Sequence, residues 1–197
     1  MNTTRIGVFI FDGAEELDFA GPWEVLASWA LNHPEDGVEI FTVAQSEGPV
    51  ACAKGMRVLA DYTWENAPQI DVLIYPGGKG TRPQVGDQAI SEWLTKTASS
   101  AQIMASVCTG ALVFAANGML DNMAATTHWG NLDQLAELGD GIEVRPHDRF
   151  VDNDFVITAA GVSAGIDMAL HLVARLASVE RAKQVRHYIQ YDPEPPV

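Results

Sequence analysis

Three short runs of mostly apolar residues constrain the fold of this chain more than any other feature of its sequence. They are RIGVFIF at residues 5–11, DVLIY at residues 71–75, and the run that ends at Val107. A strand with one solvated face alternates apolar and polar residues, whereas a near-continuous apolar run is typical of a strand buried on both faces. Helical patterns lie between these runs. They predict an α/β fold with a mainly parallel sheet sandwiched between helices.

The remaining elements follow from similar patterns. Pro22 suits the first turn of a helix whose apolar face consists of Val25, Leu26 and Trp29. Alternating residues around Lys54-Gly55 predict a hairpin at 49–64. We also expect strands at 38–43, 142–144 and 155–158, helices at 87–97, 132–138, 161–177 and 179–191, and a turn at 152–154. No repeat or linker interrupts residues 1–197, so one domain is predicted.

The charge of the chain argues against several kinds of partner. It has 12 Lys and Arg against 26 Asp and Glu, a formal net charge of −14, and nucleic-acid backbones and anionic membranes repel such a surface. We therefore expect no nucleic-acid or membrane partner, and solubility alone is the simpler reason for such a charge. No apolar run is long enough for a signal peptide or a membrane span, so a cytoplasmic location is expected.

The two cysteines, Cys52 and Cys108, are far apart and lack the spacing of metal ligands. This predicts neither a disulfide framework nor a zinc site, and we expect no metal or other cofactor. Cys52 lies in the predicted hairpin, and a structural role is the simpler interpretation for it.

Cys108 lies in SVCTG, between a predicted strand and a predicted helix that ends at Asn117-Gly118. Small-x-nucleophile-x-Gly is the pattern of a nucleophile elbow, with cysteine where the hydrolases have serine. Backbone N–H groups and the positive end of the helix dipole favour a thiolate there, and the thiolate is the reactive form of cysteine. A buried structural cysteine is the alternative. The elbow pattern favours a reactive thiol.

Three segments directly follow predicted strands: Glu15 to Asp18, Gly77-Gly78 and Cys108. In a parallel sheet the ligand site lies beyond the carboxyl ends of the strands. Paired glycines at a strand end allow a ligand to approach the main chain, although an ordinary turn has the same pattern. We therefore expect the three segments to converge on one site.

Four sequence blocks in this order resemble the DJ-1/PfpI superfamily over nearly the whole chain. They are GAEELDFAGPWEVL at 13–26, IYPGG at 74–78, SVCTGALVFAANGML at 106–120 and AAGVSAGIDMALHLVARL at 159–176. Together with the tail QVRHYIQYDPEPP at 184–196, they are most similar to isocyanide hydratases, which add water to an isocyanide to give an N-substituted formamide. The same blocks also resemble the amidase-like half of AraC-type transcriptional regulators.

The resemblance implies a flavodoxin-like fold, similar to that of class I glutamine amidotransferases, a small-molecule substrate and a homodimer. By position it makes Cys108 the nucleophile, Asp18 its carboxylate partner and Thr109 a residue that orients the site. Backbone N–H groups near Gly77, Gly78 and Thr109 would stabilise negative charge. Relatives that act as proteases have a histidine beside or near the nucleophile. Here Thr109 is the next residue, which argues against a peptidase.

The resemblance also implies a hydratase mechanism. The Cys108 thiolate attacks the isocyanide carbon, a protonated Asp18 delivers a proton to that carbon, and water releases the formamide from a thioimidate. An apolar pocket would suit the substrate, and Trp23, Trp129 and Ile166 are candidates for its walls.

Other ionisable residues in the matching blocks have simpler interpretations. Glu15 and Glu16 are expected to be solvated charges at a helix start. We expect Asp167 to cap the helix that it opens or to contact the site from outside. His128 is expected to pack near the site rather than to act as a base.

Three further functions remain open, because fold and superfamily do not set function. One is a redox-sensing, DJ-1-like stress protein in which Cys108 is oxidised. Another is a glyoxalase-like enzyme that uses the same cysteine. The third is a regulator-derived domain that binds a ligand without turnover.

Overall fold

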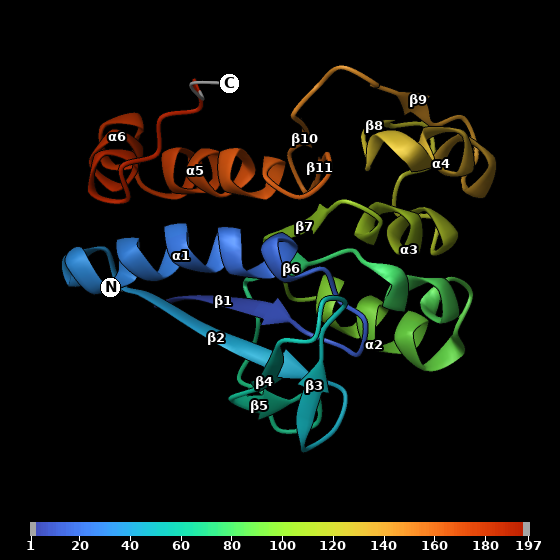
Figure 1. Ribbon diagram of the computed structural model, residues 1–197, viewed down its shortest axis with the longest axis horizontal. Coiled ribbons are helices and arrows are strands. Elements are labelled where there is room, and N and C mark those ends of the chain that lie inside the picture. Colours follow the sequence, from blue (N-terminus) through green and yellow to red (C-terminus); the bar gives the residue numbers. More distant parts are fainter. Residues whose placement is uncertain (1–2, 195–197) are drawn as a thin grey trace.

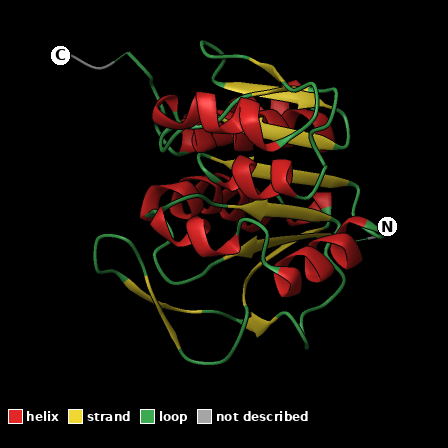
Figure 2. Ribbon diagram, turned by 90° about the vertical axis from the view of Figure 1, so that its right-hand side faces the viewer, coloured by secondary structure: helices red, strands yellow, loops and turns green. Residues whose placement is uncertain are grey.

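The structure is a computed structural model in which residues 3–194 are described. At its centre is a seven-stranded sheet of order β10-β11-β7-β6-β1-β2-β5, seen with its covering helices in Figure 1 and Figure 2. The strands are Phe150–Asn153 (β10), Val156–Ala159 (β11), Ile103–Val107 (β7), Val72–Tyr75 (β6), Thr4–Phe9 (β1), Val38–Ala44 (β2) and Tyr62–Thr63 (β5). All neighbouring pairs are parallel except β10 with β11, which confirms the predicted mainly parallel sheet.

Two small sheets lie outside this one. Pro49–Ala51 (β3) pairs with Arg57–Leu59 (β4) in the predicted hairpin, and Ala124–Ala125 (β8) pairs with Glu143–Val144 (β9). The hairpin extends from the body of the molecule (Figure 2).

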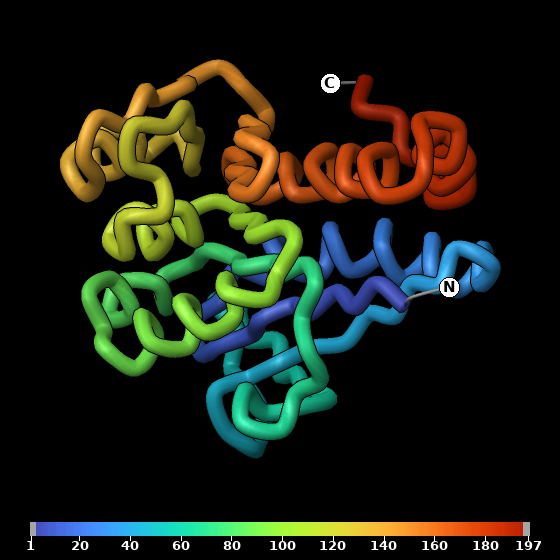
Figure 3. The backbone as a smooth tube through the Cα atoms, turned by 180° about the vertical axis from the view of Figure 1, so that it is seen from behind, coloured from blue at the N-terminus to red at the C-terminus, as the bar shows by residue number. Residues whose placement is uncertain are grey.

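Helices cover both faces of the sheet. They are Glu16–Asn32 (α1), Gln88–Ala98 (α2), Gly110–Ala116 (α3), Leu132–Leu138 (α4), Ala164–Leu176 (α5) and Val179–Tyr188 (α6), with short 3-10 turns at Pro34–Asp36 (η1), Lys79–Gln84 (η2) and Trp129–Asn131 (η3). Helices α1, α5 and α6 pack together, and α3 packs on α4 and η2 away from them (Figure 1, Figure 3). The connections between parallel strands are right-handed crossovers. Because β1-α1-β2 and β6-α2-β7 step in opposite directions along the sheet, α1 and α2 cover opposite faces of it. No helix among residues 3–194 is long and apolar enough to cross a membrane.

The central strands are buried as their sequences predict. Every residue of β6, β7 and β11 is buried, as are the last four residues of β1. The predicted apolar face of α2 is also confirmed, since Ile90, Trp93 and Leu94 are buried and Asp87 caps the helix by accepting from the Ile90 N–H at 2.9 Å.

Pro22 does not lie in the first turn of α1, as predicted, but in the interior of the helix. A proline there lacks the N–H that would bond to the carbonyl of the residue four positions earlier. Packing explains its position, because α1 and α5 approach closely at this point. A Cβ atom added to Gly165 would lie 3.1 Å from Cγ of Pro22.

The predicted turn at 152–154 is also wrong in part. Asp152 and Asn153 belong to β10, and the chain turns at Asp154, whose φ is 64°. Contacts with α5 override the low strand propensity of the aspartate. Asp152 accepts hydrogen bonds from Arg175 and contacts the His171 ring at 2.6 Å.

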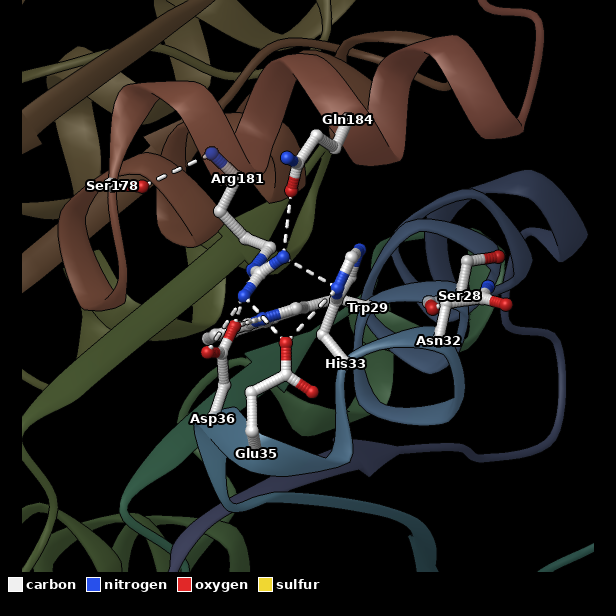
Figure 4. A network of polar contacts seen from close by, with 9 residues as sticks. All are labelled: Ser28, Trp29, Asn32, His33, Glu35, Asp36, Ser178, Arg181 and Gln184. Atoms are coloured by element: carbon white, nitrogen blue, oxygen red, sulfur yellow. Dashed lines mark hydrogen bonds and ion pairs between the residues drawn. The ribbon is translucent and has the colours of Figure 1, made fainter.

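Arg181 fixes the C-terminal helix α6 to the end of α1 (Figure 4). Its guanidinium donates to both carboxyl oxygens of Asp36 at 2.6 and 3.1 Å and to Glu35 at 2.8 Å. Asp36 also accepts from the indole N–H of Trp29 at 2.6 Å. The tail continues in the described part to residue 194, so Pro195 and Pro196 of the tail motif lie outside it.

The register of the sheet brings the functional loops to one edge. Tyr75 at the end of β6 is level with Ser106 of β7, and Val107 is level with Ala159 of β11. The loops that follow these strands therefore start side by side, as the carboxyl ends of parallel strands do.

Candidate active site

Cys108 lies in the strand-turn-helix geometry that SVCTG predicts. Its φ is 57°, a left-handed conformation that is uncommon for a residue other than glycine. The Cys108 N–H donates to the carbonyls of Ala159 and Ala160 at 3.0 and 3.1 Å, and its own carbonyl accepts from the Thr127 hydroxyl at 2.6 Å. These bonds keep the turn in its strained conformation.

Gly110 allows the helix after the turn to approach β6. A Cβ atom at this position would lie 2.4 Å from the carbonyl oxygen of Tyr75, closer than any side chain can approach. The close packing of α3 on β6 therefore explains why the elbow pattern ends in glycine.

The Cys108 side chain is 6% exposed and reaches a cavity of about 330 Å³. The cavity is lined by Glu15, Gly78, Lys79, Arg82, Cys108, Thr109, His128, Asn131 and Val162. The loops after β1, β6, β7 and β11 therefore converge on one site. Cys52, in contrast, belongs to the buried hydrophobic cluster.

Asp18 lies in the first turn of α1 and is completely buried. Its Oδ2 accepts a hydrogen bond from the Gly77 N–H at 2.9 Å. Its Oδ1 is buried and has no hydrogen-bond partner among the described residues. The carboxyl and the Cys108 thiol are close enough for each to shift the pKa of the other. The structure therefore brings together the two side chains that the sequence placed 90 residues apart.

Burial raises the pKa of both groups. It raises the pKa of Asp18 to about 6, although the Gly77 N–H and the Cys108 thiol act in the opposite direction. Burial and the negative charge of Asp18 raise the pKa of the Cys108 thiol to about 12, and the N–H groups of Thr109 and Val162 lower it less. The two groups are coupled, so their titration belongs to the pair and not to either residue alone.

The prediction of a lowered thiol pKa is therefore wrong in this geometry. Helix α3 has seven residues, and the N–H groups near its start do not offset the cost of a buried charge. Burial and the nearby Asp18 charge therefore outweigh the N–H groups that the elbow pattern led us to expect would favour a thiolate.

The glycines predicted to stabilise negative charge bind protein groups in this structure. Gly77 N–H donates to Asp18, and Gly78 N–H donates to the Thr109 hydroxyl at 2.9 Å. That hydroxyl also accepts from Thr81 at 3.0 Å. Thr109 therefore orients the loop that carries Gly78, while its own N–H acts on the Cys108 sulfur.

Several residues of the site were missed from the sequence: the cavity-lining Lys79, Arg82 and Asn131, and two residues at the elbow, Val162 and Thr127. Val162 follows β11, has a φ of 54°, and lowers the pKa of both Cys108 and Asp18 through its backbone N–H. Thr127 holds the elbow carbonyl. The rule that loops after parallel strands converge could have identified Val162, but no local pattern signals a β-branched residue at positive φ.

The predicted apolar walls are wrong. Trp129 is 79% exposed. Ile166 packs against Gly21, where an added Cβ atom would lie 3.0 Å from Cγ1 of Ile166. Trp23 packs against the hydrophobic core. None of the three lines the cavity that Cys108 reaches, and the residues that do line it are mostly polar or charged.

The neighbouring acidic residues have structural partners instead of simple solvation. Glu15 pairs with the Lys54 ammonium, and Glu16 accepts from the Lys54 backbone N–H at 2.7 Å, so both carboxylates hold the hairpin loop. Asp167 is not a helix cap: it accepts from Arg149 at 2.8 Å and from the Tyr191 hydroxyl at 3.0 Å.

His128 lines the cavity, and its Nδ1 accepts from the Gly130 N–H at 3.2 Å. In the neutral ring the proton is then on Nε2. Among residues 3–194 no cluster of three or more His, Cys, Asp or Glu could hold a metal ion.

Comparison with known proteins agrees with this geometry. The model of the DJ-1/PfpI family matches residues 4–175. The chain belongs to the DJ-1/PfpI family. It is 37% identical to isonitrile hydratase of Pseudomonas putida over 192 residues, 98% of this chain and 80% of that one.

Two further proteins are similar to this chain. A glutathione-independent glyoxalase of Caenorhabditis elegans is 27% identical over 88% of this chain and 89% of its own. The crystal structure of a ThiJ/PfpI family protein from Pseudomonas syringae superposes with a TM-score of 0.89 at 31% identity, covering 100% of this chain and 78% of that one. The recognition of the family from its sequence blocks is confirmed.

Proposed function

We propose that this protein is an isocyanide hydratase, an enzyme that adds water to an isocyanide to give an N-substituted formamide. The observation that carries the proposal is that Cys108, at the edge of a cavity, lies close enough to the buried Asp18 carboxyl for each group to shift the pKa of the other. The similarity to isonitrile hydratase supports the choice of reaction.

The first half of the reaction forms a covalent intermediate. As the Cys108 sulfur attacks the terminal carbon of the isocyanide, Asp18 takes the thiol proton on Oδ1 and passes it to the same carbon. A carbon–sulfur and a carbon–hydrogen bond form, and the product is a thioimidate with a carbon–nitrogen double bond. The thiol proton is now on carbon, and Asp18 is again a carboxylate.

The second half hydrolyses the thioimidate. Asp18 accepts a proton from the attacking water, the hydroxyl adds to carbon, and Asp18 delivers the same proton to nitrogen. The tetrahedral species then loses sulfur, which recovers its proton as the carbonyl forms. One water is consumed, the formamide leaves and the Cys108 thiol is restored. We assign the N–H groups of Thr109 and Val162 to stabilisation of the sulfur charge during attack and release.

A glyoxalase-like activity is the second candidate, because the glyoxalase from Caenorhabditis elegans is similar to this chain over most of its length. The same cysteine would attack an aldehyde carbon. Formation of lactate from methylglyoxal distinguishes this reaction from isocyanide hydration.

The test is incubation with phenyl isocyanide in ¹⁸O-labelled water under reducing conditions, with product analysis by mass spectrometry. We expect N-phenylformamide with one ¹⁸O atom from the wild type and from Cys52→Ala. We expect none from Cys108→Ala. If the wild type leaves several isocyanides unchanged, the hydratase assignment is wrong. An intact mass that increases by two oxygen atoms in mild peroxide, without any turnover, would favour a redox sensor.

A further inference from the structure

The cavity that Cys108 reaches has cationic side chains in its lining. Lys79 and Arg82, from the η2 segment that follows β6, both line it. His128 lines it as well and has a ring N–H available for donation in its neutral form. Isocyanide chemistry itself requires none of these groups, since the reaction occurs at an uncharged carbon.

The two cations are available to a ligand. Among residues 3–194, neither Lys79 nor Arg82 forms an ion pair with a carboxylate of the chain. The Arg82 guanidinium donates to the Gly78 carbonyl at 3.0 Å, which fixes the side chain beside the glycine loop. The other N–H groups of the Arg82 guanidinium remain free to bind an anion.

The acidic residue of the lining does not cancel this charge. Glu15 lines the cavity too, but it pairs with Lys54, which lies 3.9 Å from Glu16. Lys79 and Arg82 are thus two lining cations without a carboxylate partner among the described residues, and Glu15, the acidic residue of the lining, is already paired. The whole chain has a net charge of −14, so two unpaired cations beside the thiol are opposite to the general charge of the surface. Such a local field attracts anions that the remaining surface repels.

We propose that the site takes a small substrate that carries a carboxylate, bound by Lys79 and Arg82 while its reactive carbon faces Cys108. This inference rests on the proposed function for the isocyanide group and extends it to an isocyano-carboxylate. The cavity of about 330 Å³ is at the small end of ligand pockets. It therefore suits a compact molecule better than a large apolar one.

The first test compares isocyanoacetate with its methyl ester, which differ in charge and share the reacting group. We expect kcat/KM of the wild type for the acid to exceed that for the ester by about tenfold. Lys79→Met and Arg82→Met should each reduce this ratio by about threefold to fivefold, mainly through the KM of the acid. Lys96→Met, which removes an exposed cation on α2, should leave the ratio unchanged. If the ester is hydrated as fast as the acid or faster, the carboxylate proposal is wrong and the hydratase proposal stands.

The second test does not depend on turnover. Peptide mass spectrometry measures the rates at which iodoacetate and iodoacetamide alkylate Cys108. The iodoacetate rate is divided by the iodoacetamide rate, and this ratio is normalised to the same ratio for the free thiol 2-mercaptoethanol. We expect a normalised ratio well above one, which falls toward one in Lys79→Met and Arg82→Met. If no isocyanide is hydrated but iodoacetate is still preferred, the hydratase proposal fails and the anion site remains. A normalised ratio of one or less would overturn the anion site.

Discussion

The backbone N–H of Gly77 donates a 2.9 Å hydrogen bond to Oδ2 of Asp18, while Oδ1 is buried and has no hydrogen-bond partner among residues 3–194. A buried carboxyl oxygen without a donor favours the protonated form of the acid. This relationship turns Asp18 into a proton carrier beside Cys108, and the first two predictions depend on it.

The activity should require Asp18 as a carboxylate. Since its pKa is raised to about 6, kcat/KM for an isocyanide should fall about tenfold per pH unit below pH 6 and level off above it. Asp18→Asn retains an acceptor for the Gly77 N–H but cannot move a proton, so we expect a loss of about 100-fold or more at pH 7.5. A pH–rate profile measures both effects. A wild-type profile that is flat between pH 5 and 8 would contradict the proton-carrier role.

The same carboxyl should reduce the stability of the protein at neutral pH. Its folded pKa of about 6 exceeds the ordinary value of 3.8, so the folded protein holds more protons than the unfolded chain between these pH values. Stability from this group is thus present below about pH 4 and is lost as the pH rises to 6. Asp18→Asn should match the wild type near pH 4 and exceed it by up to about 3 kcal/mol at pH 7.5. Urea unfolding at the two pH values tests this; equal stability at pH 7.5 would count against a raised pKa.

Val162 should store backbone strain beside the thiol. Its φ of 54° is unfavourable for any residue with a Cβ atom, by about 1–2 kcal/mol. Val162→Gly removes this cost and Val162→Ala retains it, so the glycine variant should be more stable than the alanine variant by about 1 kcal/mol. Chemical denaturation gives the difference. If alanine is the more stable of the two, the position is not strained.

Gly77→Ala should damage the site by steric overlap alone. The added Cβ would lie 2.5 Å from the Thr109 nitrogen and 2.8 Å from Asp18 Oδ2, and relief of such overlap costs about 1–3 kcal/mol. We expect this loss of stability and a loss of hydratase activity. Gly130→Ala, where the nearest atom lies at 3.4 Å, should lose less than about 1 kcal/mol. A fully active Gly77→Ala variant would show that the loop can move away.

Arg181→Met should destabilise the attachment of α6 to α1 without affecting the chemistry. The variant leaves Asp36 without its main cation, so we expect a lower unfolding temperature at neutral pH. Arg181 holds the pKa of Asp36 below its ordinary value, so the stability from this pair is present above about pH 4 and is lost as the pH falls below it. Thermal unfolding at pH 7 and pH 3 tests this pH dependence, because Arg181→Met should lower the unfolding temperature more at pH 7 than at pH 3. Lys183→Met, an exposed change on the same helix, should have little effect.

Local patterns predicted most of the fold because they report burial. The apolar runs of β1, β6 and β7 are buried strands, and the spacing of Ile90, Trp93 and Leu94 correctly gave the inner face of α2. Pro22 and Asp152 were misplaced for one shared reason: contacts with α5, which is distant in sequence, outweigh their local preferences.

For the site, the sequence by itself pointed to Cys108 through the elbow pattern and to Asp18 through the family resemblance, and the order of strands and turns determined the edge of the sheet where both lie. The tertiary structure decided the protonation, the cavity walls and the role of Val162. Burial, unpaired oxygens and the approach of loops from four strands set these properties, and none of them exists until the chain has folded. A pKa and a pocket depend on what surrounds a residue in space, whereas the sequence specifies only what precedes and follows it.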